Sequence, residues 1–178
     1  MKHEPFNLML QGGDRRSIGK SNRVATITLE RPDRLDELMQ CVLNGDTIVR
    51  MRAADAAEKI SAKRPELLTP FKLELLELAD EVTQKEVRWH LALMIPRLHL
   101  ERCERARAVA TLYRYLADRS SIVKTFALQA LTEMSRGDPE MEADVIGLLQ
   151  RACCSGTPAM KARSRRLLTE FGNHDRSD

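Results

Sequence analysis

One sequence motif recurs four times at almost constant spacing along the chain. Its first position is an aliphatic residue followed directly by a basic one, and the four copies begin at Val49, Val87, Val123 and Met160. The steps between them are 38, 36 and 37 residues (87 − 49, 123 − 87 and 160 − 123). A fixed period of roughly twenty to fifty residues is typical of a solenoid, in which each repeat is one structural unit stacked on its neighbours.

The residues after each start predict the form of one unit. Small or apolar side chains recur four, eight and eleven positions later, which places them with the first position on one face of an α-helix. Such a helix cannot bury its apolar stripe alone, so we expect each one to pack against a partner helix and against neighbouring repeats. The stripe residues are Val49, Ala53, Ala57 and Ile60; Val87, Leu91, Ile95 and Leu98; Val123, Ala127, Leu131 and Met134; and Met160, Ser164, Leu168 and Phe171.

A ladder of basic residues accompanies the repeat. One basic residue follows each aliphatic position, and a short polar residue stands six positions before most of them. We interpret these residues as structural, with each cation bound to a polar side chain or a loop carbonyl at the turn between two helices. The alternative is an anion-binding stripe on one face of the array. The basic ladder consists of Lys20, Arg50, Arg88, Lys124 and Lys161, and the polar residues are Asp14, Asn44, Asp118 and Ser155.

In these features the chain resembles the HEAT-repeat family, whose second helix is typically preceded by Asp and opens with Val-Arg and then small residues. The resemblance covers roughly residues 31–172, with a period shorter than the usual HEAT length of about 40–47 residues. It implies an all-α fold, namely a right-handed α-α superhelix formed by a short HEAT-like (armadillo-type) solenoid of about five helix pairs. Tetratricopeptide repeats match less well, because their Trp…Leu-Gly…Tyr pattern is missing from the sequence.

Prolines, glycines and capping residues divide the chain into ten expected helices in five pairs. We expect one solenoid domain over 1–172, with a degenerate first repeat at 5–30 and a disordered tail at 173–178. Pro96 should kink or shorten its helix. Expected caps are Thr69, Asp138 and a Thr83–Glu86 capping box. The expected helices are 5–11, 14–30, 32–43, 46–61, 84–98, 101–117, 120–136, 139–153 and 158–171, and one that starts near Thr69-Pro70.

Composition argues against several classes of protein. Aromatic residues make up 4% of the chain and the net charge is +3, and neither value indicates a nucleic-acid binder by itself. No apolar run approaches the ~18 residues that a membrane span needs. The N-terminus also lacks the hydrophobic region of a signal peptide. We therefore expect a cytoplasmic protein without a membrane partner.

No pattern of catalytic, cofactor-binding or metal-ligating residues stands out. The four cysteines form no Cys-x-x-Cys motif, and His3-Glu4 is the one His-Glu dipeptide, whereas metal-binding HEAT-like enzymes use repeated ones. The segment 13–21 resembles a phosphate-binding loop, but five residues separate Gly13 from Gly19 where the Walker pattern needs four. We expect no cofactor, no metal and no small-molecule substrate, and we favour a protein that is not an enzyme.

These observations favour a scaffold that binds a protein partner through the concave face formed by the second helices. Two alternatives rest on the breadth of the family: a nucleic-acid binder related to HEAT-like DNA alkylation glycosylases, and a HEAT-like lyase. Residues 157–171 carry four basic residues and one acidic one, as a helix that follows phosphates or an acidic peptide would. The sequence does not identify the partner, the pathway or the oligomeric state. Candidate partner-binding residues are Arg52, Arg88, Lys124, Lys161, Arg163 and Arg166.

Overall fold

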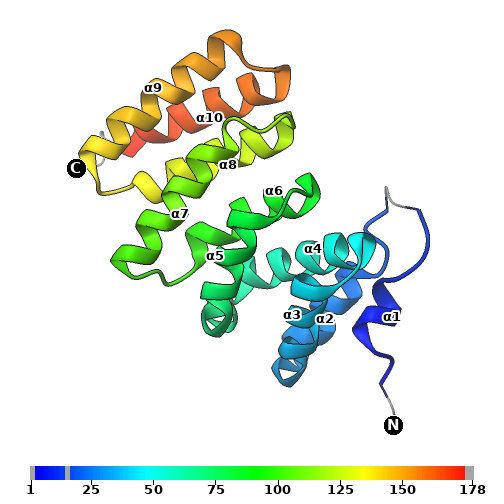
Figure 1. Ribbon diagram of the computed structural model, residues 1–178. Coiled ribbons are helices and arrows are strands. Elements are labelled where there is room, and N and C mark those ends of the chain that lie inside the picture. Colours follow the sequence, from blue (N-terminus) through cyan, green and yellow to red (C-terminus); the bar gives the residue numbers. More distant parts are fainter. Residues whose placement is uncertain (1–2, 15–16, 175–178) are drawn as a thin grey trace. The chain divides into compact units, whose positions relative to one another are not determined.

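The computed structural model describes residues 3–14 and 17–174, and every regular element in these two ranges is helical (Figure 1). Ten α-helices are present there, so the predicted all-α class is confirmed. They are α1 (Phe6–Leu10), α2 (Ser21–Glu30), α3 (Leu35–Asn44), α4 (Thr47–Lys63), α5 (Lys72–Glu81), α6 (Lys85–Met94), α7 (Arg102–Tyr115), α8 (Ser121–Ser135), α9 (Pro139–Ser155) and α10 (Pro158–His174). Three 3-10 helices, η1 (Pro32–Arg34), η2 (Pro65–Phe71) and η3 (Ile95–Arg97), lie between them.

The chain divides into two compact units, which we call the N-terminal unit (Met1–Glu104) and the C-terminal unit (Arg105–Asp178). The boundary falls near the start of α7. In the N-terminal unit α4 is central, and α2, α3 and α6 all pack against it. In the C-terminal unit α8, α9 and α10 pack against one another. The single domain expected over 1–172 stays a prediction.

The repeat correctly predicts the core of both units. All the stripe residues of the first three copies are buried, and they lie on α4, on α6 with the turn that follows it, and on α8. The fourth copy lies on α10, where Ser164 is buried and Met160, Leu168 and Phe171 are half-buried. α10 is the last helix of the described residues, and within them α8 and α9 are the helices that pack most closely on it.

Several predicted helix ends agree with the structure. Asp46 caps α4 through its carboxylate, which accepts hydrogen bonds from the backbone N–H groups of Ile48 and Val49. Asp138 caps α9 in the same way, followed by a proline at the first helical position. α6 ends at Met94 and passes into η3, which contains the proline expected to shorten it.

Other predicted ends are wrong. Asp14 and residues 17–20 are not helical, so the degenerate first repeat lacks a helix at these described positions where one was expected. Near the C-terminus, α10 continues to His174 and so includes the first two residues of the predicted disordered tail. The rest of that tail, residues 175–178, lies outside the described ranges. Thr69 lies within η2, since Pro70 has no N–H to continue an α-helical bond pattern. α6 starts one residue too late for Thr83 to occupy its capping position.

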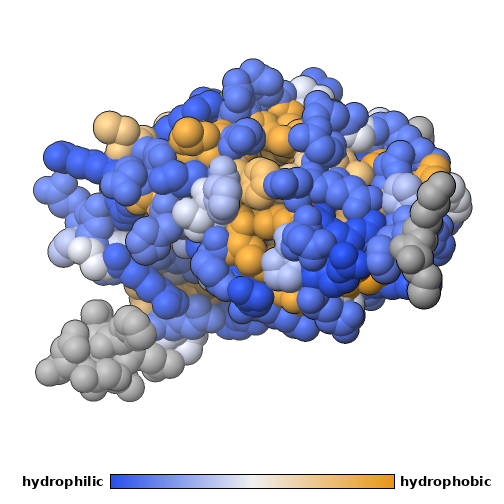
Figure 2. Space-filling model, turned by 90° about the horizontal axis from the view of Figure 1, so that it is seen from below, coloured by the Kyte–Doolittle hydropathy of each residue, from blue (hydrophilic) through white to orange (hydrophobic). Residues whose placement is uncertain are grey.

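Polar and charged side chains cover most of the face in Figure 2, and apolar side chains are visible between them. In the part of the chain that the structure describes, no helix is both long enough and apolar enough to cross a membrane.

Candidate binding surface of the C-terminal unit

In the N-terminal unit, two arginines of the basic ladder bind the chain itself. Arg50 Nη2 donates to the Leu43 carbonyl at 3.0 Å, and Arg88 Nε donates to the Val82 carbonyl at 2.6 Å. Both carbonyls stand at the C-terminal end of the preceding helix, where the last carbonyls lack an intrahelical donor and carry partial negative charge. These contacts are of the kind that the structural interpretation expects. They also use Arg88, a candidate partner-binding residue, inside the fold.

Asn44, Asp118 and Lys20 form other contacts. The Asn44 amide donates to the Gln40 side chain, and the neighbouring ladder cation, Arg50, binds a carbonyl instead. The carboxylate of Asp118 accepts a hydrogen bond from the backbone N–H of Ser120 at 2.7 Å. Lys20 precedes α2, and its ammonium forms an exposed ion pair with Glu4 at 3.4 Å. The ladder cations of α4 and α6 thus reach helix-end carbonyls.

Arg52 is buried, so its expected role as a partner-binding residue is wrong. The residue is 2% exposed and projects from α4 into the loop between α1 and α2. Its guanidinium donates to the carbonyls of Leu10 at 2.7 Å, Gly12 at 2.5 Å, Asp14 at 2.9 Å and Ser17 at 3.0 Å. One side chain therefore satisfies most of a loop whose backbone lacks regular structure.

A second buried polar cluster lies between α2, α4 and α6. Asp55 accepts hydrogen bonds from Ser21 Oγ and from Lys59 Nζ, and His90 Nε2 lies 3.9 Å from its other oxygen. Burial lowers the pKa of His90 to about 4, although the nearby Asp55 charge acts in the opposite direction. These residue types occur in catalytic sites, but Ser21 is 0% and His90 is 2% exposed. A substrate cannot reach them, and we assign the cluster to the core.

Residues 3–14 and 17–174 contain no group of three or more His, Cys, Asp or Glu side chains placed to hold a metal ion. Burial, helped by the neighbouring Glu37 charge, raises the pKa of the Cys41 thiol to about 11, which leaves it protonated and a poor ligand.

In the C-terminal unit the ladder positions carry lysines that are free. The side chains of Lys124 and Lys161 are half-exposed, and neither has a hydrogen-bond or ion-pair partner among the described residues. The same holds for Arg119 and Arg151, which are exposed and which the repeat pattern did not select. A sequence signal for Arg151 exists, because residues 145–169 contain no acidic residue. Their five basic residues are Arg151, Lys161, Arg163, Arg165 and Arg166.

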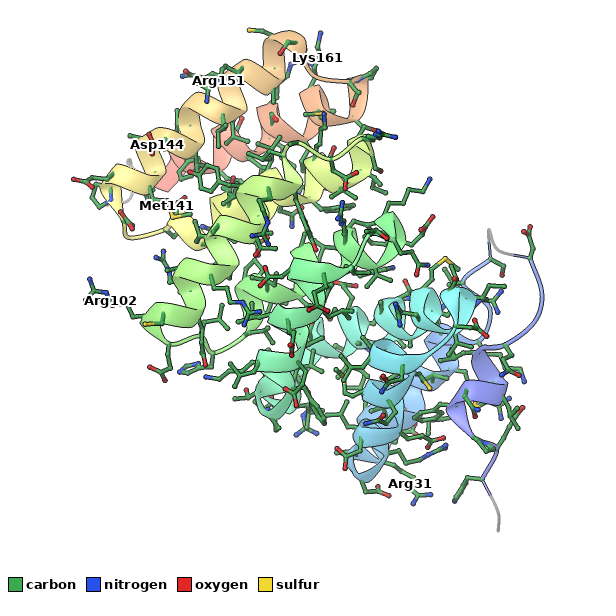
Figure 3. The ribbon with its side chains drawn as sticks, viewed as in Figure 1. Arg31, Arg102, Met141, Asp144, Arg151 and Lys161 are labelled. Atoms are coloured by element: carbon green, nitrogen blue, oxygen red, sulfur yellow. The ribbon has the colours of Figure 1, made fainter. Side chains whose placement is uncertain are left out.

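Charge is separated along α9. Glu140, Glu142 and Asp144 lie in its first turns, whereas Arg151 lies near its end, close to the turn that leads to Lys161 on α10 (Figure 3). Acidic residues at the start of a helix and basic residues near its end are favourable for the helix dipole. The turn between α9 and α10 is consequently a positively charged region of the C-terminal unit.

A groove of about 520 Å³ lies between α8 and α10. Ile122 in this groove is 42% exposed, which is unusual for a large apolar side chain. The Arg163 guanidinium donates to Gln129 and lies 5.4 Å from the centre of the Phe126 ring. Arg166 forms an exposed ion pair with Glu170 at 3.3 Å. The groove residues used below are Ile122, Phe126, Ala159, Ala162, Arg163 and Arg166.

Comparison of the chain with protein-family models, with curated proteins and with solved structures finds no match in any of the three. Function must therefore be inferred from the chain's own residues.

Proposed function

We propose that the protein is a non-enzymatic scaffold that binds an acidic, amphipathic segment of a protein partner. In this proposal its helix pairs form a short HEAT-like solenoid with a right-handed α-α superhelix. The 36–38-residue period and its buried stripe support the solenoid. The groove between α8 and α10 carries the binding proposal, because α8 and α10 are the second helices of the last two pairs.

The groove offers an anchoring site for apolar side chains. Ile122 is exposed and Phe126 half-buried on α8, and the small residues Ala159 and Ala162 face them from α10. A concave apolar surface of this kind favours burial of a partner's side chains. An amphipathic helix supplies such side chains at positions i, i+4 and i+7 along one face.

The rim of the groove favours an acidic partner. Arg163 and Arg166 border the groove and carry positive charge. Within α10, Glu170 is the one acidic residue. Aspartate or glutamate beside the apolar anchors would form charge-assisted hydrogen bonds with these guanidiniums. A basic partner would be repelled, so the rim provides selectivity as well as affinity.

Nucleic-acid binding is the second candidate, and the acid-free stretch 145–169 favours it. Binding to phosphates depends on the basic residues alone, so it would weaken steeply with salt and would not need Ile122. The 4% aromatic content leaves little surface for base stacking. No observation favours the lyase alternative.

Selection from a displayed library of helical peptides of about four turns tests the proposal. The wild-type protein should enrich peptides with apolar residues at i, i+4 and i+7 and acidic residues beside them. In fluorescence anisotropy, Ile122→Glu should weaken binding of an enriched peptide by at least about tenfold, which corresponds to ~1.4 kcal/mol. The double variant Arg163→Glu/Arg166→Glu should also weaken it, because the acidic residues then meet like charges.

Leu73→Glu is the matched control. Leu73 is 54% exposed on α5 and lies outside the groove, so this variant should bind the peptide as the wild type does. Equal enrichment on the Ile122→Glu variant would refute the groove. Single-stranded DNA that binds independently of Ile122 and dissociates in moderate salt would establish the second candidate.

A further inference from the structure

A separate hollow of about 350 Å³ lies where the start of α8, the second half of α9 and the start of α10 meet. Three basic side chains line it: Arg119 from the turn before α8, Lys124 from α8 and Arg151 from α9. We call this hollow the cationic pocket. It is distinct from the groove between α8 and α10, since Ser121 is the one residue that lines both.

The cations of this pocket are uncompensated. No acidic residue lines the pocket, and none of the three cations has a side-chain partner within the described ranges. The nearest acid along the chain, Asp118, turns its carboxylate onto the backbone N–H of Ser120. Like charges that converge on one hollow repel each other, and an anion removes this repulsion. The pocket is therefore built to accept negative charge.

The remaining lining favours a compact oxyanion. Hydroxyl groups of Ser121 and Thr157 provide neutral hydrogen-bond donors beside the three cations. α8 starts at the pocket with no side-chain cap, so its first backbone N–H groups add partial positive charge. Arginine can bind a tetrahedral oxyanion with two parallel hydrogen bonds, and lysine adds a point charge.

We propose that the cationic pocket binds a phosphate monoester. A phosphate monoester carries up to two negative charges and three acceptor oxygens, which suits three cations and several donors better than a single carboxylate does. The ester belongs either to a phosphorylated side chain of a partner or to a small molecule in solution. This inference does not depend on the proposed groove, because it rests on different residues.

Isothermal titration calorimetry of the full chain with O-phosphoserine and with a short phosphoserine peptide tests the proposal. Both should bind, and Lys124→Met and Arg151→Met should each weaken binding by at least about tenfold, since each removes a charge-assisted contact. Neither side chain has a partner among the described residues, so the melting temperature should not fall in either variant. Tighter binding of the peptide identifies a phosphoprotein as the source, and equal binding identifies a small ester.

Arg165→Met is the matched control, because Arg165 is exposed on α10 and does not line the pocket. It should bind phosphoserine as the wild type does. Binding should also weaken as the pH falls through about 6, where a phosphate monoester gains its second proton. Sulfate gains no proton in this range, so sulfate binding should not change with pH.

Three results would overturn the proposal. The first is no heat of binding with either phosphoserine probe at millimolar concentration. The second is equal binding of a peptide with glutamate in place of phosphoserine, which would indicate general attraction of negative charge. The third is tighter binding of single-stranded DNA than of phosphoserine, with Arg165→Met and Lys124→Met weakening DNA binding equally. That result would indicate an extended nucleic-acid surface instead of a phosphate pocket.

Discussion

In the N-terminal unit the ladder residue of α4 and of α6 is an arginine that binds a helix-end carbonyl, whereas in the C-terminal unit it is a lysine without a partner among the described residues. Arginine presents five donors on a planar fork and is weakly hydrated, so it binds carbonyls well at a partly buried position. Lysine is a strongly hydrated point charge on a flexible stem. The comparison suggests that the type of basic residue decides whether the ladder position supports the fold or stays available.

Some other cations of the two units differ in the same way, although Arg166 of the C-terminal unit also forms an ion pair, with Glu170. In the N-terminal unit Arg97 binds Glu58 at 2.6 Å, and Lys72 pairs with Glu104 at 2.7 Å. In the C-terminal unit Arg119 and Arg151 have no such partner in the described chain. Paired cations stabilise one conformation, while a group of unpaired ones creates a field that attracts anions. This difference is why both proposals lie in the C-terminal unit.

The largest expected effect comes from Arg52→Met. The change leaves the carbonyls of Leu10, Gly12, Asp14 and Ser17 without their donor, and each bond to a charged group is worth about 1.5–3 kcal/mol. We expect a loss of at least about 3 kcal/mol in the free energy of unfolding, measured by chemical denaturation.

Hydrogen exchange should localise this effect. The backbone N–H groups of Gln11 and Ser17, which bond to backbone carbonyls, should exchange faster in Arg52→Met, because Arg52 donates to carbonyls of the same loop. Arg165→Met is the exposed control and should change stability by no more than about 0.5 kcal/mol. A loss below about 1 kcal/mol in Arg52→Met would mean that the loop holds its conformation without this residue.

The second prediction concerns acid stability. The pKa of His90 falls from 6.5 to about 4 on folding, so between these values the unfolded chain binds a proton that the folded protein does not. The free energy of unfolding should therefore decrease by up to about 3 kcal/mol as the pH falls from 6.5 to 4, and no such loss occurs above 6.5. Asp55 and Lys59, the charged neighbours of His90, adjust this loss without changing its sign.

Denaturation curves of wild type and His90→Gln across this pH range measure the effect. The variant should show a smaller slope of stability against pH, because the titrating group is gone. His99→Gln, at an exposed position, should keep the wild-type slope. Identical slopes in wild type and His90→Gln would assign the acid sensitivity to carboxylates instead.

The sequence predicts much of the fold because the repeat encodes burial. Positions such as Ala53 and Leu91 were placed in the core from their spacing alone, and they are buried. It does not predict the burial of Arg52. The partners of Arg52 are backbone carbonyls about 40 residues earlier, as for Gly12, and a backbone carbonyl leaves no residue-type signal.

The candidate surface was predicted in part. The ladder selected Lys124 and Lys161, which lie in the C-terminal unit, but it could not select Arg119 and Arg151, since they do not occupy the repeated position. Only packing brings Arg119, Lys124 and Arg151 to one hollow. The acid-free stretch 145–169 marks Arg151 and the repeated position marks Lys124, but neither signal alone marks the whole pocket.

A smaller effect is expected from Arg88→Lys. Lysine keeps the charge but loses the fork that places Nε 2.6 Å from the Val82 carbonyl. We expect a loss of about 1 kcal/mol in the free energy of unfolding, measured by urea denaturation, and a similar loss for Arg50→Lys. If both variants are as stable as the wild type, a lysine serves the ladder position equally well. The type of basic residue would then not explain the difference between the ladder positions of the two units.

The smallest expected effect is that of the reciprocal change, Lys124→Arg. If the residue type decides the use of the position, the new guanidinium should turn toward the carbonyls at the end of α7 and stabilise the protein by about 0.5 kcal/mol. Phosphoserine binding should then weaken, because the side chain leaves the cationic pocket. Backbone N–H groups of Leu116 and Ala117 already bond to the last turn of α7, which keeps the expected gain small. If Lys124→Arg leaves stability unchanged and strengthens phosphoserine binding, the arginine has stayed in the pocket. The ladder cation would then be free because the carbonyls at the end of α7 are already bonded, and not because it is a lysine.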